Sequence, residues 1–539
     1  MENREIFYAS DSNSQAHSAI NAVTVRISVV TPVYNPPQIA FEKCIESVLN
    51  QKYLDWEWCL VDDCSSQAWV RKRLNELQAQ DQRIKVYFRS KNGGIVAASN
   101  DALALVSGEF VALLDNDDAL HLDALEEVAN CVLANPTVDY IYTDEDKIDE
   151  DGEHYEPFLK PKWSPERFLA QNYCSHLSVI RTSLINKVGR FRDGFDGSQD
   201  YDLFLRVTEQ TTNISHIPKI LYHWRAVTGS TAFAADNKLY AFASATKAVR
   251  EHLERRSIPA EVGFNQTNLM VTIKRKLATH PKVGIIIPTC GTRKSVFGVD
   301  TCLVVNAVES ILRKTTYANY EIIVVVDEGT PASVYRDLRR VGRDRLRIVD
   351  YDKSFNFSEK CNLGAVNTDA PLVLLLNDDT EVISPDWLET MVGHISESDV
   401  AMVGPLLVYE DNRIQSAAHS NTPTPHNFCS GHSSRALGEF GILVCARECS
   451  GVTGACALIK RDVYFEVGGL SEVFPLAFND CDFAFKVLER GYRIIWTPHA
   501  RLFHFETASR PNHVEPREVQ LITNRWGRFF DNDQYCKIN

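Results

Sequence analysis

Acidic residues directly follow two hydrophobic segments of this sequence, and together they could hold a divalent cation. Residues 110–114 lead into the acidic tetrad 115–118, and residues 372–376 lead into Asn-Asp-Asp at 377–379. Two carboxylates separated by one residue at the end of a strand can converge on one hard cation such as Mg²⁺ or Mn²⁺, which then bridges protein oxygens and diphosphate oxygens. The simpler alternative is a polar turn in which Asp118 caps the next helix.

A second pair of acids, Asp200 and Asp480, stands in Asp-x-Asp contexts at the start of amphipathic segments. A carboxylate at a helix start that faces a cleft can act as a general base, whereas the alternative is ordinary N-capping, worth about 0.5–2 kcal/mol. His223 follows Asp200 by 23 residues, and His504 follows Asp480 by 24. This shared spacing favours a role for both histidines in the site, such as metal ligation, over two buried strand-end histidines.

These acids belong to a repeating pattern of strands and helices. The β-branched runs at 25–34 and 283–289 are typical of buried parallel strands. Each is followed by a helical segment and then by a second expected strand, at 56–63 and 320–327, which ends in acid. Strands that alternate with helices and carry acids at their carboxyl ends predict an α/β fold with ligands bound at that edge.

The spacing of matching residues indicates two copies of one domain. Asn100 and Asn362 are 262 residues apart, and so are Asp117 and Asp379. The additional residues of the second copy are expected in a surface loop at 409–450. The predicted division is a polar tail at 1–24, a first domain at 25–235, a linking helix and connector at 236–280, and a second domain at 281–539.

The composition indicates a folded globular protein and excludes several functional classes. A chain of 539 residues fits two to four domains of about 100–200 residues, and 44% hydrophobic residues exclude wholesale disorder. The formal net charge is −14 and the longest basic cluster is 274–276, which argues against a nucleic-acid partner. No run approaches the roughly 18–20 apolar residues of a membrane span, and the first 21 residues lack the apolar core of a signal peptide, so we expect a cytoplasmic protein.

Several common motifs are missing from the sequence. It has no GxGxxG after a strand, no GxxxxGK[ST] and no GxSxG. Most of the 14 cysteines are expected to be buried and reduced. One group lacks the CxxC pair usual in structural zinc sites, which favours loop and core cysteines over zinc. The members of this group are Cys429, Cys445, Cys449 and Cys456, with His419, His426 and His432 nearby.

Specific motifs recur in the same order in the two copies. Those of the first copy are Thr-Pro-Val-Tyr-Asn35, Leu-Val-Asp-Asp63, Leu-Leu-Asp-Asn-Asp-Asp118, Tyr-Thr-Asp-Glu-Asp-Lys147, Gly-Ser-Gln-Asp-Tyr-Asp-Leu203 and Leu-Tyr-His-Trp-Arg225. Those of the second copy are Phe-Asn-Phe-Ser-Glu-Lys-Cys-Asn362, Leu-Asn-Asp-Asp-Thr-Glu-Val382, Thr-Gly-Ala455, Val-Gly-Gly-Leu470, Asn-Asp-Cys-Asp482 and His-Phe-Glu-Thr-Ala-Ser509. With these motifs, nearly the whole chain beyond Val25 resembles family 2 of the inverting nucleotide-sugar glycosyltransferases, which have the GT-A fold. More narrowly, it is similar to the tandem-domain bacterial enzymes of O-antigen and cell-surface polysaccharide biosynthesis.

The resemblance implies a role for each matching residue. In the first domain, the nucleobase would bind to Pro32, Tyr34 and Asp63 or Asp62. The rest of the nucleotide-sugar donor would contact Asn100 and Asp115. The metal would be bound by Asp115, Asp117 and His223, and Asp200 would be the catalytic base. In the second domain, the nucleobase would bind to Thr289 and Asp327. The rest of the donor would contact Asn362 and Asp378. The metal would be bound by Asp379 and His504, and Asp480 would be the catalytic base.

The resemblance also implies the cofactor and the partners. The cofactor would be Mg²⁺ or Mn²⁺, and the donor a UDP-, dTDP- or GDP-linked sugar. The acceptor would be a glycan carried on a polyprenyl diphosphate at the inner face of the cell membrane. Any membrane association is expected to be peripheral or through partners, because no basic amphipathic helix is evident.

The second copy departs from the family pattern at several positions. Asn377 replaces the first aspartate of the metal pair, and the base-binding motif has become Asp327-Glu-Gly-Thr330. The leading hypothesis, which rests on the repeated motifs, is an enzyme with two active transferase sites. The alternative, which these departures favour, is one active domain with a degenerate second domain that binds glycan or acts as a scaffold. A third hypothesis is a metal-dependent phosphohydrolase built from the same acidic clusters.

Overall fold

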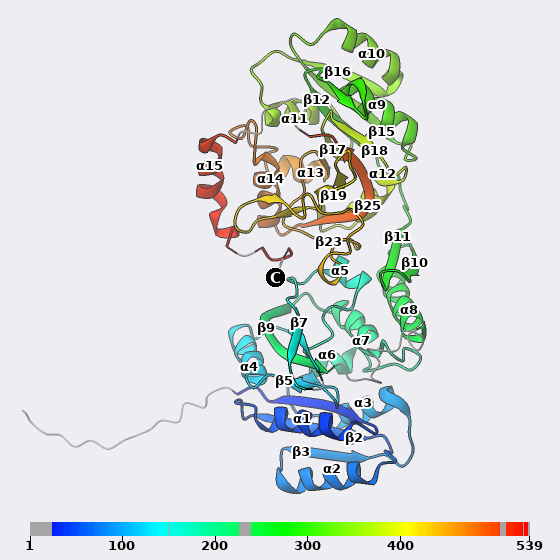
Figure 1. The fold of residues 1–539 in the computed structure, drawn as a ribbon, viewed down its shortest axis with the longest axis vertical. Helices are drawn as coiled ribbons and strands as arrows, with labels where there is room; N and C mark the ends of the chain where they lie inside the picture. The colour runs from blue at the N-terminus through cyan, green and yellow to red at the C-terminus, as the bar shows by residue number, and fades with distance from the viewer. Residues whose placement is uncertain (1–23, 150, 226–238, 507–513, 532, 537–539) are drawn as a thin grey trace, which may run out of the picture.

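The computed structural model describes residues 24–149, 151–225, 239–506, 514–531 and 533–536. Two α/β units lie one above the other along the long axis of the molecule, and the linking segment runs along one side (Figure 1). All but the last residue of the predicted tail at 1–24 lies outside the described residues, as does the predicted boundary at 235/236. No helix in the described part of the chain combines the length and the apolar character needed to cross a bilayer.

The first unit is built on one mixed sheet with the strand order β3-β2-β1-β4-β8-β6-β9-β5, to which β7 adds beside β6. β1 pairs in parallel with β2 and β4, whereas β8 is antiparallel to β4. The strands are β1 (Ile27–Val33), β2 (Trp56–Asp62), β3 (Ile84–Phe88), β4 (Phe110–Leu113), β5 (Ala119–Leu120), β6 (Tyr140–Ile148), β7 (His154–Phe158), β8 (Ser178–Arg181) and β9 (Ile214–Arg225).

Helices cover both faces of this sheet, which explains why β1 and β2 are buried along almost their whole length and are mostly hydrophobic. One face packs against α1, α2 and α4, and the other packs against α3, α7 and α8. The helices are α1 (Gln38–Leu49), α2 (Ala68–Gln80), α3 (Gly94–Leu105), α4 (Ala124–Ala134), α5 (Pro165–Ala170), α6 (Thr182–Lys187), α7 (Gln199–Thr208) and α8 (Leu239–Arg255).

The second unit repeats this topology, with the equivalent strand order β16-β15-β12-β17-β24-β19-β25-β18 and the additions β20 and β23. The prediction of two tandem α/β domains with Rossmann-like sheets is therefore confirmed. The strands of this unit are β12 (Val283–Thr289), β13 (Arg293–Val296), β14 (Val299–Cys302), β15 (Tyr320–Asp327), β16 (Leu346–Tyr351), β17 (Leu372–Leu376), β18 (Thr380–Val382), β19 (Val400–Val408), β20 (Ile414–Ser416), β21 (His419–Ser420), β22 (His426–Asn427), β23 (Arg447–Glu448), β24 (Cys456–Lys460) and β25 (Arg493–His504). The helices are α9 (Leu303–Lys314), α10 (Ala332–Gly342), α11 (Phe357–Val366), α12 (Trp387–Ile395), α13 (Arg461–Glu466), α14 (Asn479–Glu489) and α15 (Pro516–Trp526).

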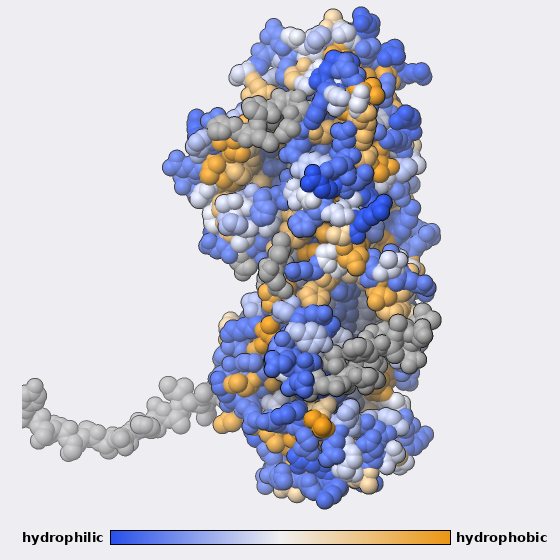
Figure 2. All heavy atoms as spheres, in the orientation of Figure 1, coloured by the Kyte–Doolittle hydropathy of each residue, from blue (hydrophilic) through white to orange (hydrophobic). Residues whose placement is uncertain are grey.

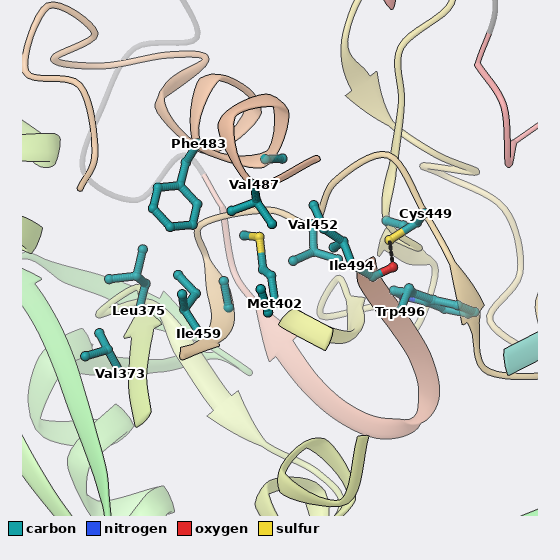
Figure 3. Close-up of a cluster of buried hydrophobic side chains, with 14 of the residues drawn as sticks. Val373, Leu375, Met402, Cys449, Val452, Ile459, Phe483, Val487, Ile494 and Trp496 are labelled. Carbon is teal, nitrogen blue, oxygen red and sulfur yellow. Dashed lines mark hydrogen bonds between the residues drawn. The ribbon is translucent and has the colours of Figure 1, made fainter. Parts of the chain in front are cut away.

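Helix α14 shows how the core positions a functional residue. Its Phe483 and Val487 point onto the sheet, where they meet Met402 of β19 and Ile459 of β24 (Figure 3). All four side chains are buried. This packing fixes the helix against the sheet and thereby fixes Asp480 in its first turn.

The linking segment contains the expected helix and also a hairpin that was not predicted. α8 packs Ala248, Val249 and Leu253 into the core of the first unit. After it, β10 (Ala260–Asn265) and β11 (Met270–Arg275) form an antiparallel pair beside the second unit. The connector is therefore an ordered part of both units.

A buried ion pair joins the connector to the first unit, and a buried hydrogen bond joins the two units directly. Arg275 at the end of β11 donates two hydrogen bonds of 2.7 Å to Glu166 in α5 of the first unit. Glu448 in β23 of the second unit accepts hydrogen bonds from Ser164 and from Arg493, the latter at 2.6 Å. Ion pairs of this kind are geometrically demanding, so they define one arrangement of the two units.

The prediction that residues 409–450 form a surface loop is wrong for much of the segment. The segment contains β20–β23, and His419, Arg447 and Glu448 are buried within it. These polar side chains tolerate burial because they have partners: Arg447, for example, donates to the Ala417 carbonyl at 2.8 Å. On the face shown in Figure 2, hydrophilic residues predominate on both units, and hydrophobic residues form separate patches between them.

The clustered cysteines occupy two kinds of position, with three in the core and Cys429 half-buried. Cys445, Cys449 and Cys456 are buried and reduced, and the Cys449 thiol contacts the Ile494 carbonyl at 3.7 Å (Figure 3).

Candidate active site

A cavity of about 250 Å³ opens at the carboxyl ends of β1 and β2 in the first unit. Pro32, Tyr34 and Asp63, which were predicted for the nucleobase site, all line it. Asp63 is buried, and its two carboxylate oxygens accept hydrogen bonds from the backbone N–H groups of Gly93 and Gly94 at 2.9 and 2.8 Å. The remaining lining residues are Val33, Asn92, Ile95, Ala98 and Asn116.

Asp62, the alternative to Asp63, has a local structural contact. Its carboxylate accepts a hydrogen bond from the Ser65 N–H at 3.0 Å and thus closes the turn after β2. The geometry therefore favours Asp63 over Asp62 as the acid that faces a ligand in this cavity.

The acidic tetrad lies beside this cavity, at the end of β4. The Asn116 amide donates to the Pro32 carbonyl at 2.9 Å and thereby ties the tetrad to β1. Asp118 is buried and accepts hydrogen bonds from the Tyr222 hydroxyl at 2.6 Å and from the Arg225 N–H at 2.7 Å. The alternative that Asp118 caps the next helix is wrong, because Asp123 precedes α4 and Asp118 pairs with β9 instead.

A second, smaller cavity of about 60 Å³ brings Asp115, His176 and Asp200 to one surface. Pro32 and Ile95 line both cavities, so the two adjoin. Asp200 lies in the first turn of α7 and accepts a hydrogen bond from the Asn172 amide at 2.9 Å. Burial raises the pKa of the Asp200 carboxyl, against the opposing charge of His176. A carboxyl group with a raised pKa is better suited to accept a proton.

The donor atoms at this end of the first unit fit a hard divalent cation. Ligand atoms of Asp115, Asp118 and His176 lie within 4.8 Å of one another. Burial, together with the nearby charge of Asp115, raises the pKa of Asp117 to about 6. Carboxylates crowded in this way repel each other, and a bound cation would remove the repulsion.

His176 is a residue that the sequence reasoning missed. It lies two residues before β8, and β8 runs antiparallel to β4, whose carboxyl end carries Asp115. The start of β8 therefore lies beside the end of β4. A histidine just before an antiparallel neighbour of the acidic strand was the signal that could have identified it.

His223, the predicted metal ligand of the first domain, lies among other partners. Its Nδ1 is 2.6 Å from Asp146, whose second oxygen is 2.8 Å from Nδ1 of His154. Asp146 is in β6, which runs parallel to the end of β9. Ligation of a donor-bound metal by His223 therefore remains a prediction, and the structure brings His176 to Asp115 instead.

Asn100 and Asn362, predicted for the donor sites, occupy equivalent positions with equivalent contacts. The Asn100 amide exchanges hydrogen bonds with the backbone N–H and carbonyl of Phe191, at 3.1 and 3.0 Å. Asn362 does the same with Leu470, at 3.0 and 2.9 Å. Both amides anchor the loop that leads toward the base-bearing helix, and their contact with a donor remains a prediction.

In the second unit, the predicted nucleobase residues are engaged by neighbouring side chains. The Thr289 hydroxyl donates to Asp378 at 2.6 Å. Asp327 forms an ion pair of 2.7 Å with Lys360, whose ammonium group also donates to the Thr289 carbonyl at 3.0 Å. Lys360 is 1% exposed, so this pair lies inside the region that corresponds to the first unit's open cavity.

The predicted metal ligands of the second unit lie close together. His504 Nε2 is 3.3 Å from the Asp379 carboxylate and 3.4 Å from the Asn377 amide nitrogen. Burial opposes protonation of His504, but the charge of Asp379 outweighs it and raises the pKa of the imidazole. The buried Asn377 Oδ1 has no hydrogen-bond partner in the described part of the chain, so these oxygen and nitrogen donors also fit a hard cation.

Asp480, the predicted base of the second unit, lies in the first turn of α14. One carboxylate oxygen accepts hydrogen bonds from the Cys481 N–H at 2.8 Å, and the other accepts from the Gly454 N–H at 2.9 Å. The imidazole of His419 lies 3.8 Å from the second oxygen.

Comparison with known proteins identifies the domain in both units. The model of "Glycosyl transferase family 2" matches residues 28–189 and 285–468. An uncharacterized protein (y4gI) of Sinorhizobium fredii is 40% identical over 524 residues, which are 93% of this chain and 56% of that protein. The O-antigen biosynthesis protein RfbC of Myxococcus xanthus is 33% identical over 490 residues, 90% of this chain and 38% of the relative.

The chain thus spans about half or less of the length of these two relatives. Among solved structures, Staphylococcus aureus TarS (residues 1–349, in complex with UDP-GlcNAc) matches with a TM-score of 0.35 and 20% identity, covering 42% of this chain and 66% of that one. The matched family regions include most of β1 and of its equivalent β12, together with the acidic segment of each unit. The chain therefore belongs to glycosyl transferase family 2, with the family's domain present once in each α/β unit.

Proposed function

We propose that the chain is an inverting, metal-dependent hexosyltransferase with two active sites, which moves sugars from nucleotide-sugar donors to a growing surface polysaccharide. The observation that carries the proposal is the pair of adjoining cavities in the first unit, one lined by Pro32, Tyr34 and Asp63 and the other by Asp115 and Asp200. The relatives support the polysaccharide product, since they include an O-antigen biosynthesis protein and chondroitin synthases.

The arrangement suggests how the residues of the first unit act. The nucleobase would lie in the larger cavity against Tyr34 and Asp63, and the diphosphate would extend toward the tetrad. Asp200 would accept the proton of an acceptor hydroxyl as its oxygen bonds to the anomeric carbon and the bond to the diphosphate oxygen breaks. Attack from the side opposite the leaving group inverts the configuration, so no covalent enzyme intermediate is needed.

The metal would be held by the acids at the strand ends. Asp115 and Asp117 would hold Mg²⁺ or Mn²⁺ in the first unit, and Asp379 with His504 in the second. When bound, the cation offsets the negative charge that builds on the departing nucleoside diphosphate.

The donor and the acceptor define the remaining parts of the proposal. We infer a UDP-, dTDP- or GDP-linked donor and a glycan carried on a polyprenyl diphosphate. Such substrates meet at the cytoplasmic face of the membrane, which is the location we propose for the protein.

Two observations favour an alternative in which only the first unit is active. Asn377 removes one negative charge from the second metal site, and Lys360 occupies the second nucleobase region. In this alternative, the second unit binds acceptor glycan or acts as a scaffold.

Replacement of the two bases one at a time tests these proposals. Transfer is followed with a panel of UDP-, dTDP- and GDP-linked hexoses, Mn²⁺ and lipid-linked glycan, and the linkages of the product are determined. Asp200→Asn and Asp480→Asn should each abolish a different linkage, with a loss of about 10²–10⁴-fold. Asp196→Asn, which changes an exposed acid close to Asp200 in the sequence, is the matched control and should leave transfer unchanged.

The outcomes separate the hypotheses. If Asp480→Asn leaves every linkage intact, the second unit is not a transferase and the one-site alternative holds. If the protein cleaves nucleotide-sugars rapidly without acceptor and transfers nothing when acceptor is added, both transferase proposals fail in favour of hydrolysis.

A further inference from the structure

We propose that His419, delivered by the segment 409–450 that enlarges the second unit, is a positioning residue for the Asp480 carboxylate. This inference rests on the proposed function of Asp480 as a catalytic base. His419 lies in β21 and is 4% exposed. Its Nε2 lies 3.8 Å from the same Asp480 oxygen that accepts the Gly454 N–H.

The equivalent position in the first unit shows what His419 replaces. Asn172, nine residues before the end of β8, donates to Asp200 at 2.9 Å. Nine residues before the end of the equivalent strand β24 stands Gly451, which has no side chain to offer. The second unit thus lacks the amide that holds the base of the first.

The imidazole of His419 fills the space that this glycine leaves. A Cβ atom built on Gly451 would lie 3.1 Å from His419 Nδ1 and 3.0 Å from the Cβ of Ala484, closer than such atoms ordinarily pack. The backbone N–H of His419 also donates to the Gly451 carbonyl at 2.8 Å. The first unit therefore supplies the hydrogen-bond donor to its base, Asn172, from the loop before β8. The second unit supplies it, as His419, from a separate segment that packs on the equivalent loop.

Neighbouring groups orient the ring. Nδ1 of His419 is 3.6 Å from the Cys481 thiol, within the range of a sulfur hydrogen bond. A thiol that donates to Nδ1 leaves the proton on Nε2, the nitrogen that faces Asp480. Cys481 follows Asp480 directly, so the base, its neighbour and the imidazole form one buried group.

A neutral imidazole suits this role better than a charged one. Burial lowers the pKa of His419, although the charge of Asp480 opposes the shift, so the ring stays uncharged at neutral pH. A neutral N–H can orient a carboxylate without the strong decrease in basicity that an adjacent cation would cause. The gap of 3.8 Å exceeds a normal hydrogen bond, and such contacts commonly shorten when reactants bind.

Steady-state kinetics test the role directly. The full chain carries Asp200→Asn, so that only the second unit transfers sugar, and the donor comes from the panel of UDP-, dTDP- and GDP-linked hexoses. His419→Leu should lower kcat about 10–100-fold with little change in the donor KM, whereas His419→Gln, whose Nε2 can donate from a similar position, should stay within about threefold of the parent. His432→Gln, an exposed histidine of the same segment, is the control and should change neither constant.

A matched variant tests the equivalence of the two units. In a chain carrying Asp480→Asn, Asn172→Leu should lower the kcat of the first unit in the same way. The inference is overturned if His419→Leu leaves kcat unchanged. It is also overturned if His419→Leu and His419→Gln lose kcat equally with a raised KM, because that pattern indicates a purely structural role.

A spectroscopic measurement remains decisive if the second unit proves inactive. In the full chain labelled with ¹⁵N-histidine at pH 7.5, His419 should be the neutral tautomer with hydrogen on Nε2, and Cys481→Ala should weaken that preference. The titratable groups that influence this ring are Asp480, Cys481, His426 and Asp533. A charged ring or hydrogen on Nδ1 would overturn the inference, whereas unchanged products from Asp480→Asn would overturn the catalytic role of the second unit itself.

Discussion

The two units share one sheet topology but differ in how their acids are balanced. In the first unit, Asp63 faces an open cavity, accepts hydrogen bonds from the N–H groups of Gly93 and Gly94, and pairs with Arg89 at 3.3 Å. In the second, Asp327 is neutralised by buried Lys360. Lys360 precedes Asn362 by two residues, just as Ala98 precedes Asn100. Both acids thus have a basic partner, but only in the second unit does it come from the helix that follows this region, where Lys360 replaces the small Ala98.

The acids near the metal sites show the same contrast. Asp115 and its neighbours crowd together in the first unit, and the pKa of Asp117 rises to about 6 as a result of burial and of that charge. In the second unit, Asp379 pairs with His504 and one aspartate is replaced by Asn377. His504 thus offsets acidic charge in the second unit, whereas in the first unit the carboxylates still repel one another. This difference is the basis for expecting the two units to differ in their affinity for a cation.

The largest expected effect concerns the ion pair that fills the second nucleobase region. Lys360→Ala should destabilise the protein by about 3–5 kcal/mol, because it leaves the partly buried Asp327 carboxylate without its cation. Urea denaturation at pH 7 measures the loss. Lys353→Ala, which removes an exposed lysine close by, is the control and should cost less than about 1 kcal/mol. A cost as small as the control's would mean that the pair does not stabilise the second unit.

The mirror substitution tests the same difference in the first unit. Ala98→Lys should place an ammonium group in the open cavity, pair it with Asp63 and weaken UDP, dTDP or GDP binding at least tenfold. Isothermal titration with each nucleotide measures this change. Unchanged affinity for every nucleotide would show that this cavity is not where the nucleobase binds.

A smaller effect is expected from exchanging one charge between the metal sites. Asn377→Asp should tighten Mn²⁺ binding to the second unit, and Asp115→Asn should weaken it in the first, each by about tenfold, because affinity for hard cations follows the ligand charge. Electron paramagnetic resonance titration of free Mn²⁺ measures both. If Asn377→Asp changes nothing while Asp115→Asn has its expected effect, metal binding at the second acidic segment is refuted.

Features that depend on a short stretch of sequence could be predicted, whereas features that depend on contacts between distant segments could not. The β-branched runs and their acidic ends predicted the sheets, because burial on both faces leaves a continuous hydrophobic signal. His176 and Lys360 were missed because their positions depend on which strands and helices become neighbours in space. The hairpin at 260–275 left a weaker signal in its alternating Val262 and Phe264, which sequence reasoning could have used.

The same reasoning explains the errors within the segment 409–450. A run rich in serine, histidine and cysteine is typical of a surface loop, but here Glu448 is buried because it finds partners outside the segment. One partner, Arg493, lies tens of residues further along the chain, and the other, Ser164, lies in the other unit. Spacing alone did identify Asn100 and Asn362 as equivalent, although it could not show that both amides anchor a loop.

The smallest expected effect is the acid sensitivity of the first unit. Glu57 in β2 accepts hydrogen bonds from Ser28 and Ser107, and it pairs with Lys85 at 2.8 Å. Burial opposes its ionisation, but Lys85 and the serines outweigh burial and lower the pKa of Glu57 to about 2. Because the folded pKa is below the unfolded value, this stabilisation is present above about pH 4.5 and is lost as the pH falls toward 2.

Allowing for solvent screening, the loss between pH 6 and pH 3.5 should be about 1 kcal/mol. Urea unfolding at the two pH values measures how much the free energy of unfolding falls on acidification. That fall should be smaller in Glu57→Gln than in the parent by about 1 kcal/mol. The matched control is Glu321→Gln at the equivalent position of β15, where Gly284 stands in place of Ser28 and the carboxylate meets Thr368 and Lys282. Glu321→Gln retains Glu57, so it should keep the part of the parent's acid sensitivity that Glu57 causes. Equal acid sensitivity in Glu57→Gln and the parent would show that the two strands do not differ in this respect.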